Sequence, residues 1–161
     1  MAARVGIVTV SDSRFAGDNL DQSGPALIEA LQPLGFSDFD SALVPDEVEA
    51  IQSILTKLSL RCRIIFTTGG TGFAPRDITP EATAPLIEKR ADNICELLRL
   101  KGLEHTKLSH MSRGVSGIRG GCLIVNLPGS PKACRQGVEA LAPLLPEIVA
   151  SLESDGCSHE G

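Results

Sequence analysis

Four apolar runs along the chain are predicted to be buried strands. They are short, and each gives way to small or polar residues. The segments between them show helical periodicity. The predicted strands are residues 4–10, 39–44, 63–68 and 122–127. The predicted helices are residues 23–35, 46–58, 79–90, 93–100 and 131–153.

Several of these helices carry residues that favour starting or stopping a helix. Ser23 and Thr79 occupy N-cap positions, and Gly35 is a stop signal after the first helix. Pro143 and Pro146 should kink or break the last helix, because proline cannot donate a main-chain hydrogen bond inside a helix.

Strands and helices alternate along the chain, and this order predicts right-handed crossover connections between parallel strands. We therefore expect an α/β fold of three layers (αβα), in which helices cover both faces of a mainly parallel sheet. The length of 161 residues is typical of one domain. We expect the domain to occupy residues 1–153, followed by a polar tail or linker at residues 154–161.

The composition argues against several classes of protein. A net charge of −5 and the absence of Trp and Tyr disfavour a nucleic-acid surface. No run approaches the roughly 18 apolar residues of a transmembrane segment, and the first residues do not resemble a secretory signal. The 5 cysteines lack C-x-x-C spacing, so we expect reduced thiols in the cytosol and not disulfides or a zinc site. The histidines also lack metal-binding spacing and are expected in loops or on the surface: His105, His110 and His159.

Every predicted strand is followed by small, acidic or glycine-rich residues. In an open α/β sheet, ligands bind outside the carboxyl ends of the strands, so these loops should form the binding site. The loops are SDSR (11–14), PDE (45–47), GGTGFAPRD (69–77) and PGSP (128–131).

Two of these loops have the composition of a phosphate site. In the GGTG loop, Gly69, Gly70, Thr71 and Gly72 would let backbone N–H groups approach an anion without interference from side chains. The loop lacks the Gly-Lys-Ser/Thr of a Walker A motif, and a simple tight turn is the alternative. In PGSP, Ser130 would cap a helix whose N-terminus favours phosphate, although a helix cap alone also explains the sequence.

Three aspartates also follow predicted strands: Asp12, Asp46 and Asp77. Carboxylates beside a phosphate loop would repel the ligand unless a cation bridges them, and Mg²⁺ does so with one or two carboxylates plus substrate phosphates. Alternatively, Asp46 could cap the helix after it, and Asp77 could pair with Arg76 or cap the turn before Thr79.

The segment 108–121 is rich in Ser and Gly and has little periodicity, which is typical of a functional loop. Its hydroxyls include Ser109, Ser112 and Ser116, and it lacks the signature of a nucleophilic serine. Three basic residues in or beside the glycine-rich segments could neutralise phosphate charge, or could simply be solvated: Arg113, Arg119 and Lys132. The residues alone thus predict a Mg²⁺-dependent phosphate or nucleotide site, without identifying the substrate.

Five motifs, in this order, resemble the molybdopterin adenylyltransferase family. That family includes MogA-type enzymes, the G domain of the plant molybdenum-cofactor synthesis protein and the amino-terminal G domain of gephyrin. The motifs are DQSGP (21–25), VPDE (44–47), TTGGTGFAPRDITPEAT (67–83), MSRGVSGIRG (111–120) and NLPGSP (126–131).

The resemblance implies a reaction in which molybdopterin and Mg-ATP give adenylylated molybdopterin and pyrophosphate. It also implies a cytoplasmic homotrimer and a partner E domain for metal insertion. Two alternatives are a gephyrin-like receptor-anchoring scaffold, with postsynaptic membrane association, and a homologue that binds the pterin without adenylylating it.

Carried over to this chain, the family places acidic active-site residues at Asp46 and Asp77 and a hydroxyl at the substrate site at Ser112. We expect all three residues to be catalytic, and the two aspartates to bind Mg²⁺. The GGTG and PGSP loops would hold the nucleotide. The full set expected to bind the nucleotide or pterin is Ser11, Asp12, Gly69, Gly70, Thr71, Gly72, Arg113, Ser116, Pro128, Gly129 and Ser130.

Overall fold

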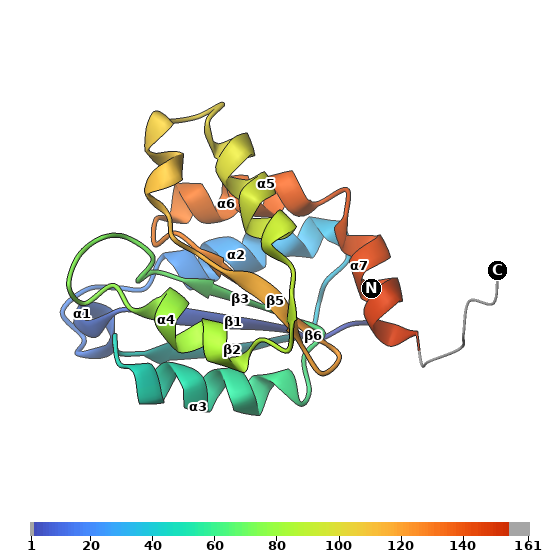
Figure 1. Cartoon of the computed structure of the whole chain (residues 1–161), viewed down its shortest axis with the longest axis horizontal. Coiled ribbons are helices and arrows are strands. Elements are labelled where there is room, and N and C mark those ends of the chain that lie inside the picture. Colours follow the sequence, from blue (N-terminus) through green and yellow to red (C-terminus); the bar gives the residue numbers. More distant parts are fainter. Residues whose placement is uncertain (1, 155–161) are drawn as a thin grey trace.

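A six-stranded sheet with the strand order β2-β1-β3-β6-β5-β4 crosses the protein (Figure 1). The structure is a computed structural model that describes residues 2–154. The four predicted strands are present, and all of them pair in parallel, β1 with β2 and β3, and β3 with β6. They are β1 (Val5–Val10), β2 (Phe39–Val44), β3 (Ile64–Thr68) and β6 (Cys122–Leu127).

Two further strands extend the sheet through antiparallel pairs, β5 with β6 and β4 with β5, and the sequence pattern predicted neither strand. β5 (Ser116–Arg119) lies in the segment predicted to be a loop and forms a hairpin with β6. Gly120 has φ 56°, which allows this tight turn. β4 (Lys89–Arg90) falls in the predicted helix 79–90, which is wrong in its second half. That helix is reduced to α4 (Thr79–Thr83) and a 3₁₀ turn, η2 (Ala84–Leu86).

Helices cover both faces of the sheet, which confirms the three-layer α/β fold (Figure 1). One face packs against α3 (Val48–Ser59) and α4. The other packs against α2 (Ser23–Leu31), α5 (Asp92–Gly102), α6 (Pro131–Leu141) and α7 (Leu145–Glu153). The remaining helical turns are α1 (Asp12–Phe15), η1 (Gln32–Leu34) and η3 (Lys107–Met111).

The interruption predicted for the last helix is confirmed as a break: α6 ends at Leu141, before Pro143, and α7 begins at Leu145, with Pro146 in its first turn. Ser23 is not the cap of α2 but its first residue. The carboxylate of Asp21 instead accepts hydrogen bonds from the N–H groups of Ser23, at 3.1 Å, and Gly24, at 3.2 Å. The Ser23 hydroxyl is thereby free to donate to the carbonyl oxygen of Gly129, at 2.6 Å, and it ties α2 to the PGSP loop.

The four cysteines in the described part of the chain are buried free thiols, as predicted. Burial raises the pKa of Cys62 to about 11 and that of Cys122 to about 12. The predictions for Cys157, His159 and most of the tail concern residues outside the described range. Between residues 2 and 154, no helix has both the length and the apolarity needed to cross a membrane.

A buried amide connects the sheet to the loops at its carboxyl edge. Asn126 in β6 donates to the hydroxyls of Thr67, at 2.9 Å, and Thr83, at 3.1 Å. Its side-chain oxygen accepts from the N–H of Val115, at 3.1 Å. Because Asn126 is only 2% exposed, these bonds are shielded from bulk water. The residue therefore holds β3, α4 and the segment before β5 together.

We predict that Asn126→Ala lowers the free energy of unfolding by about 2–3 kcal/mol, because it leaves buried donors and acceptors without partners. Urea denaturation measures this loss. The matched control is Asn93→Ala, on the exposed side of α5. Equal losses in the two variants would show that the Asn126 network contributes little.

Candidate active site

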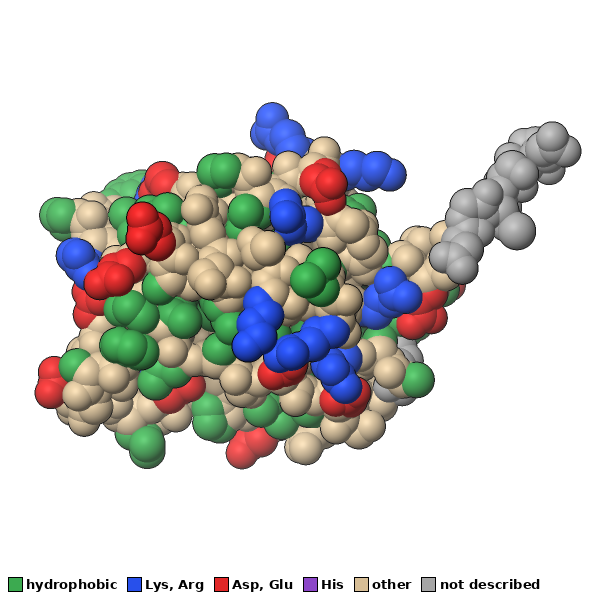
Figure 2. All heavy atoms as spheres, turned by 90° about the horizontal axis from the view of Figure 1, so that it is seen from below, with side chains coloured by type: hydrophobic (Ala, Val, Ile, Leu, Met, Phe, Trp, Pro, Cys, Tyr) green, Lys and Arg blue, Asp and Glu red, His purple; other side chains and the backbone are tan. Residues whose placement is uncertain are grey.

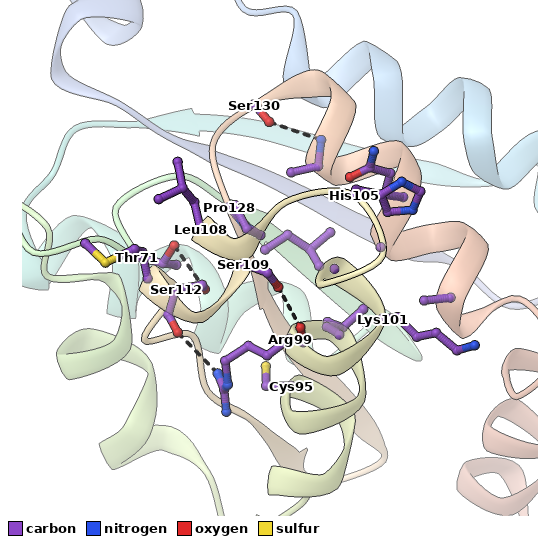
Figure 3. Close-up of a pocket in the computed structure, with 18 of the residues that line it drawn as sticks. Thr71, Cys95, Arg99, Lys101, His105, Leu108, Ser109, Ser112, Pro128 and Ser130 are labelled. Atoms are coloured by element: carbon purple, nitrogen blue, oxygen red, sulfur yellow. Dashed lines mark hydrogen bonds between the residues drawn. The ribbon is translucent and has the colours of Figure 1, made fainter.

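A cavity of about 730 Å³ opens at the carboxyl edge of the sheet (Figure 3). Its walls come from the GGTG loop, the PGSP loop, the helices α5 and α6, the turn η3, and the MSRGVSGIRG motif at residues 111–120, called the MSRG segment below. The cavity therefore lies where the loops after β3 and β6 were predicted to meet. Its lining includes eight residues of the predicted site: Gly70, Thr71, Gly72, Asp77, Ser112, Pro128, Gly129 and Ser130.

The GGTG loop has a backbone conformation that requires glycine. Gly69 has φ 100° and Gly70 has φ 69°. A Cβ atom at Gly69 would collide with the carbonyl oxygen of Val10, and one at Gly70 would collide with the hydroxyl of Thr79. Thr79, predicted to cap a helix, instead fixes this loop. Its N–H donates to the Gly70 oxygen and its hydroxyl to the Gly69 oxygen, each at 3.0 Å.

Backbone donors of the same loop remain available for a ligand. Within the described range, the N–H groups of Gly70, Thr71 and Gly72 donate to no protein acceptor, and all three residues line the cavity. Unpaired N–H groups at the wall of a cavity are suited to an anion. The loop thus combines a tight turn with unpaired N–H groups in residues that line the cavity. The PGSP loop does form the expected cap, because the Ser130 hydroxyl accepts from the Ala133 N–H at 3.0 Å, and it also lines the cavity.

Asp46 and Asp77 both lie beside the GGTG loop. The Oδ1 atom of Asp46 is 3.1 Å from where a Cβ of Gly70 would be, and the Oδ2 atom of Asp77 is 2.8 Å from the same position on Gly72. Asp77 lines the cavity, whereas Asp46 lines a second hollow together with Arg76. Across residues 2–154, no three acidic, histidine or cysteine side chains are close enough to hold a metal ion by themselves.

Two of the three alternative roles considered for these aspartates are wrong. Asp46 does not cap α3, which begins after Glu47 without a side-chain cap. Its carboxylate accepts from the N–H of Asp12 and its own N–H donates to the Asp12 carboxylate, both at 2.9 Å. Burial raises the pKa of Asp46, and the nearby charges of Asp12 and Asp77 raise it further. Asp77 does not pair with Arg76, but its carboxylate does stabilise the turn before Thr79 by accepting from the N–H of Ala74 at 3.0 Å.

The carboxylate of Asp12 accepts hydrogen bonds from Arg76 and from the N–H of Asp46, and Asp12 does not line the cavity. The guanidinium of Arg76 donates to both Asp12 oxygens, at 2.8 and 3.0 Å. These bonds and the N–H of Asp46 hold the pKa of Asp12 below its usual value. Ser11, also predicted to bind a ligand, caps α1 by accepting from the Arg14 N–H at 3.3 Å, and it lies outside the lining as well.

The MSRG segment brings only one of its predicted residues to the cavity. Ser112 lines it and donates to the Thr71 hydroxyl at 3.4 Å. Arg113 lies outside the lining and pairs with Glu81. Ser116 is fully buried. Its hydroxyl donates to the Ala91 oxygen at 2.6 Å and accepts from the Cys95 N–H at 3.1 Å, so it is not available to a ligand. Arg119 and Lys132 are not in the lining either, and Arg119 donates to the Leu86 oxygen.

The outer wall, formed by α5 and η3, contains residues that the sequence did not assign to the site. Arg99 donates to the carbonyl oxygen of Ser112 at 3.4 Å (Figure 3). It also donates to the carbonyl oxygen of Gly114 at 3.0 Å, and so supports the MSRG segment. Ser109 donates to the Arg99 oxygen at 2.7 Å. Only Ser109 had a signal in the sequence, as one of the hydroxyls of segment 108–121. Arg99 gave no such signal. In the sequence it is one polar residue of a predicted helix, and helical periodicity does not reveal contacts to a loop farther along the chain.

We predict that Gly70→Ala destabilises the protein more than Gly17→Ala does. Both glycines have positive φ, so alanine costs about 1–2 kcal/mol of backbone strain at either position. Only at Gly70 does the new methyl group also collide with Thr79, since nothing lies within 4 Å of the same position at Gly17. Urea denaturation of the two variants measures the difference. Equal losses would mean that the loop can move away from Thr79.

A family model and a solved structure both match this chain over most of its length. Residues 6–147 match the family described as a probable molybdopterin binding domain. The crystal structure of the molybdopterin biosynthesis enzyme MoaB from Thermus thermophilus superimposes with a TM-score of 0.84 at 44% identity, covering 93% of this chain and 96% of that one.

Two relatives differ in how much of their length this chain spans. It is 39% identical over 149 residues to the molybdopterin adenylyltransferase of Helicobacter pylori, covering 90% of this chain and 85% of the relative. It is 40% identical over 162 residues to gephyrin of Dictyostelium discoideum, covering 93% of this chain but only 22% of that protein. The matched residues include the loops that form the cavity, and the chain therefore belongs to the molybdopterin-binding domain family.

Proposed function

We propose that this domain is a molybdopterin adenylyltransferase, which transfers AMP from Mg-ATP to the phosphate of molybdopterin and releases pyrophosphate. The observation that carries the proposal is the unpaired N–H groups of the GGTG loop, which border a cavity also lined by Asp77 and Ser112. The name and 39% identity of the Helicobacter relative support the same activity.

The cavity is suited to two anionic substrates that react with each other. Its volume of about 730 Å³ is within the range of about 300–1,000 Å³ typical of small-molecule sites. The nucleotide phosphates would contact the GGTG amides and the N-terminus of α6 at PGSP. The hydroxyl of Ser112, on a separate segment, would bind the pterin substrate. Both ligands would thus share one continuous space.

The acidic groups fit a bound Mg²⁺. Asp46 and Asp77 present oxygen ligands beside the phosphate loop, and the pKa of Asp46 is raised by its burial and then by the charges of Asp12 and Asp77. A cation would relieve this unfavourable placement of negative charge. Two carboxylates together with substrate phosphates are an ordinary set of ligands for Mg²⁺. When bound, the ion would neutralise negative charge on the triphosphate.

The reaction needs little chemistry from the protein's side chains. An oxygen of the molybdopterin phosphate attacks the α-phosphorus of ATP, and the bond from that phosphorus to the bridging oxygen of pyrophosphate breaks. The attacking phosphate is already ionised, so no general base has to remove a proton. The loop amides and Ser112 would hold the two phosphates in line, and positioning would provide most of the rate enhancement.

A scaffold role is the second candidate, and it is supported by the 40% identity to Dictyostelium gephyrin. A third candidate is a homologue that binds the pterin without adenylylating it. The homotrimer, the partner E domain, the cytoplasmic location and any postsynaptic association remain predictions from the family resemblance. Pyrophosphate release discriminates among the three functions. A protein that binds the pterin, but neither binds ATP nor releases pyrophosphate, would favour the third candidate. A trimer that binds neither the pterin nor ATP would favour the scaffold.

We predict that Asp77→Asn lowers the rate of pyrophosphate release by about 100-fold or more, measured at saturating Mg-ATP and molybdopterin. The amide oxygen of asparagine can still accept from the Ala74 N–H, so the loop should stay folded. Asp18→Asn, on an exposed loop, is the control and should retain full activity. An unimpaired Asp77→Asn enzyme would remove Asp77 from the mechanism.

A further inference from the structure

The two walls of the cavity that carry Asp77 and Ser112 come from segments far apart in the sequence. The side chains that line these walls share one hydroxyl contact, between Ser112 and Thr71, and at 3.4 Å it is weak. The relative position of these walls must therefore be fixed by other groups. Arg113, next to Ser112, provides the required contacts.

Arg113 connects its own segment to both ends of the 72–77 turn. Its main-chain N–H donates to the Thr71 oxygen at 2.9 Å. In its side chain, Nε donates to the Gly72 oxygen at 2.8 Å and Nη2 to the Asp77 oxygen at 2.9 Å. The guanidinium thus connects the first residue of the turn, Gly72, to its last residue, Asp77.

Glu81 in α4 holds this guanidinium in place. Its two carboxylate oxygens accept from Nη1 at 3.0 Å and Nη2 at 2.9 Å, which is the bidentate geometry preferred by arginine. The side chain of Arg113 is 34% exposed, so solvent screens the pair only in part. Since its charge is already paired and it does not line the cavity, Arg113 is poorly placed to bind phosphate directly, in contrast to the sequence-based expectation.

We propose that Arg113 is a positioning residue that fixes the 72–77 turn, and Asp77 with it, against the segment that carries Ser112. This role rests on the proposed adenylyl transfer, in which each wall holds one of the two reacting phosphates. A displacement of about 1 Å between reacting groups can cost about 100-fold in rate, so the turn needs a rigid attachment. Lysine cannot provide it, because one ammonium lacks the planar fork that reaches two carbonyls and a carboxylate together.

The kinetic test compares Arg113→Ala, Arg113→Lys and Glu81→Gln with the control Arg90→Ala, which breaks an exposed ion pair. We expect Arg113→Ala and Arg113→Lys to lower kcat by about 100-fold with KM for both substrates unchanged, because the contacts act on alignment and not on affinity. Glu81→Gln, which keeps both carbonyl contacts, should lose less. Full activity of Arg113→Lys, or a rise in KM alone, would overturn the inference.

A second measurement does not depend on turnover. Hydrogen exchange reports the protection of the Ala74 and Asp77 amides, which are hydrogen-bonded within the turn. In Arg113→Ala we expect faster exchange in residues 72–77 and unchanged exchange in β1 and β3. Unchanged protection of the turn would overturn the inference even if the variant were inactive. If the unaltered protein released no pyrophosphate, the proposed function would fail, and the exchange experiment alone would decide the role of Arg113.

Discussion

Parallel pairing of β1, β3 and β6 is the constraint on which the site depends. Parallel strands place their carboxyl ends at one edge, so the loops that follow them meet there whatever their distance in sequence. The hydrogen-bond ladder continues past the strands, since the Gly69 N–H donates to the Leu127 oxygen and the Ser11 N–H to the Val44 oxygen. Gly69, the first residue of the GGTG loop, is therefore positioned by the sheet itself. The position of Gly69 thus does not depend on the conformation of the rest of the loop.

The electrostatics of this edge are unusual for a site proposed to bind triphosphate. Two arginines close to the GGTG loop already pair with carboxylates, Arg76 with Asp12 and Arg113 with Glu81. The positive character offered to a ligand comes instead from backbone N–H groups, while Asp46 and Asp77 stay close to them. Such a site favours an anion that brings its own cation, which is how ATP reaches an enzyme.

Rigidity around the cavity comes from polar groups whose hydrogen bonds are made within the protein. Asn126 joins β3 and α4, Ser116 anchors the start of α5, and Arg99 supports the MSRG segment. The described part of the chain contains no buried side-chain nitrogen or oxygen without a hydrogen-bond partner. Fully satisfied networks of this kind keep loops in one arrangement, and the proposed in-line transfer would require such order.

Patterns along the chain were sufficient to predict the four parallel strands, the layered fold, the break before α7 and the glycine loop at the strand ends. These features follow from local periodicity and from the conformational limits of proline and glycine, both of which operate over a few neighbouring residues. The family motifs also led to Asp77 and Ser112, which the structure brings to one cavity. The partners of the polar groups, in contrast, emerge only once the chain is folded. Asp46 could have been a helix cap, yet it exchanges hydrogen bonds with Asp12, which lies 34 residues away in the sequence. Arg113 was expected at a phosphate, and its guanidinium donates to the main-chain oxygens of Gly72 and Asp77. Long or polar side chains find their partners across the fold, and no pattern along the chain encodes which loop will arrive beside them.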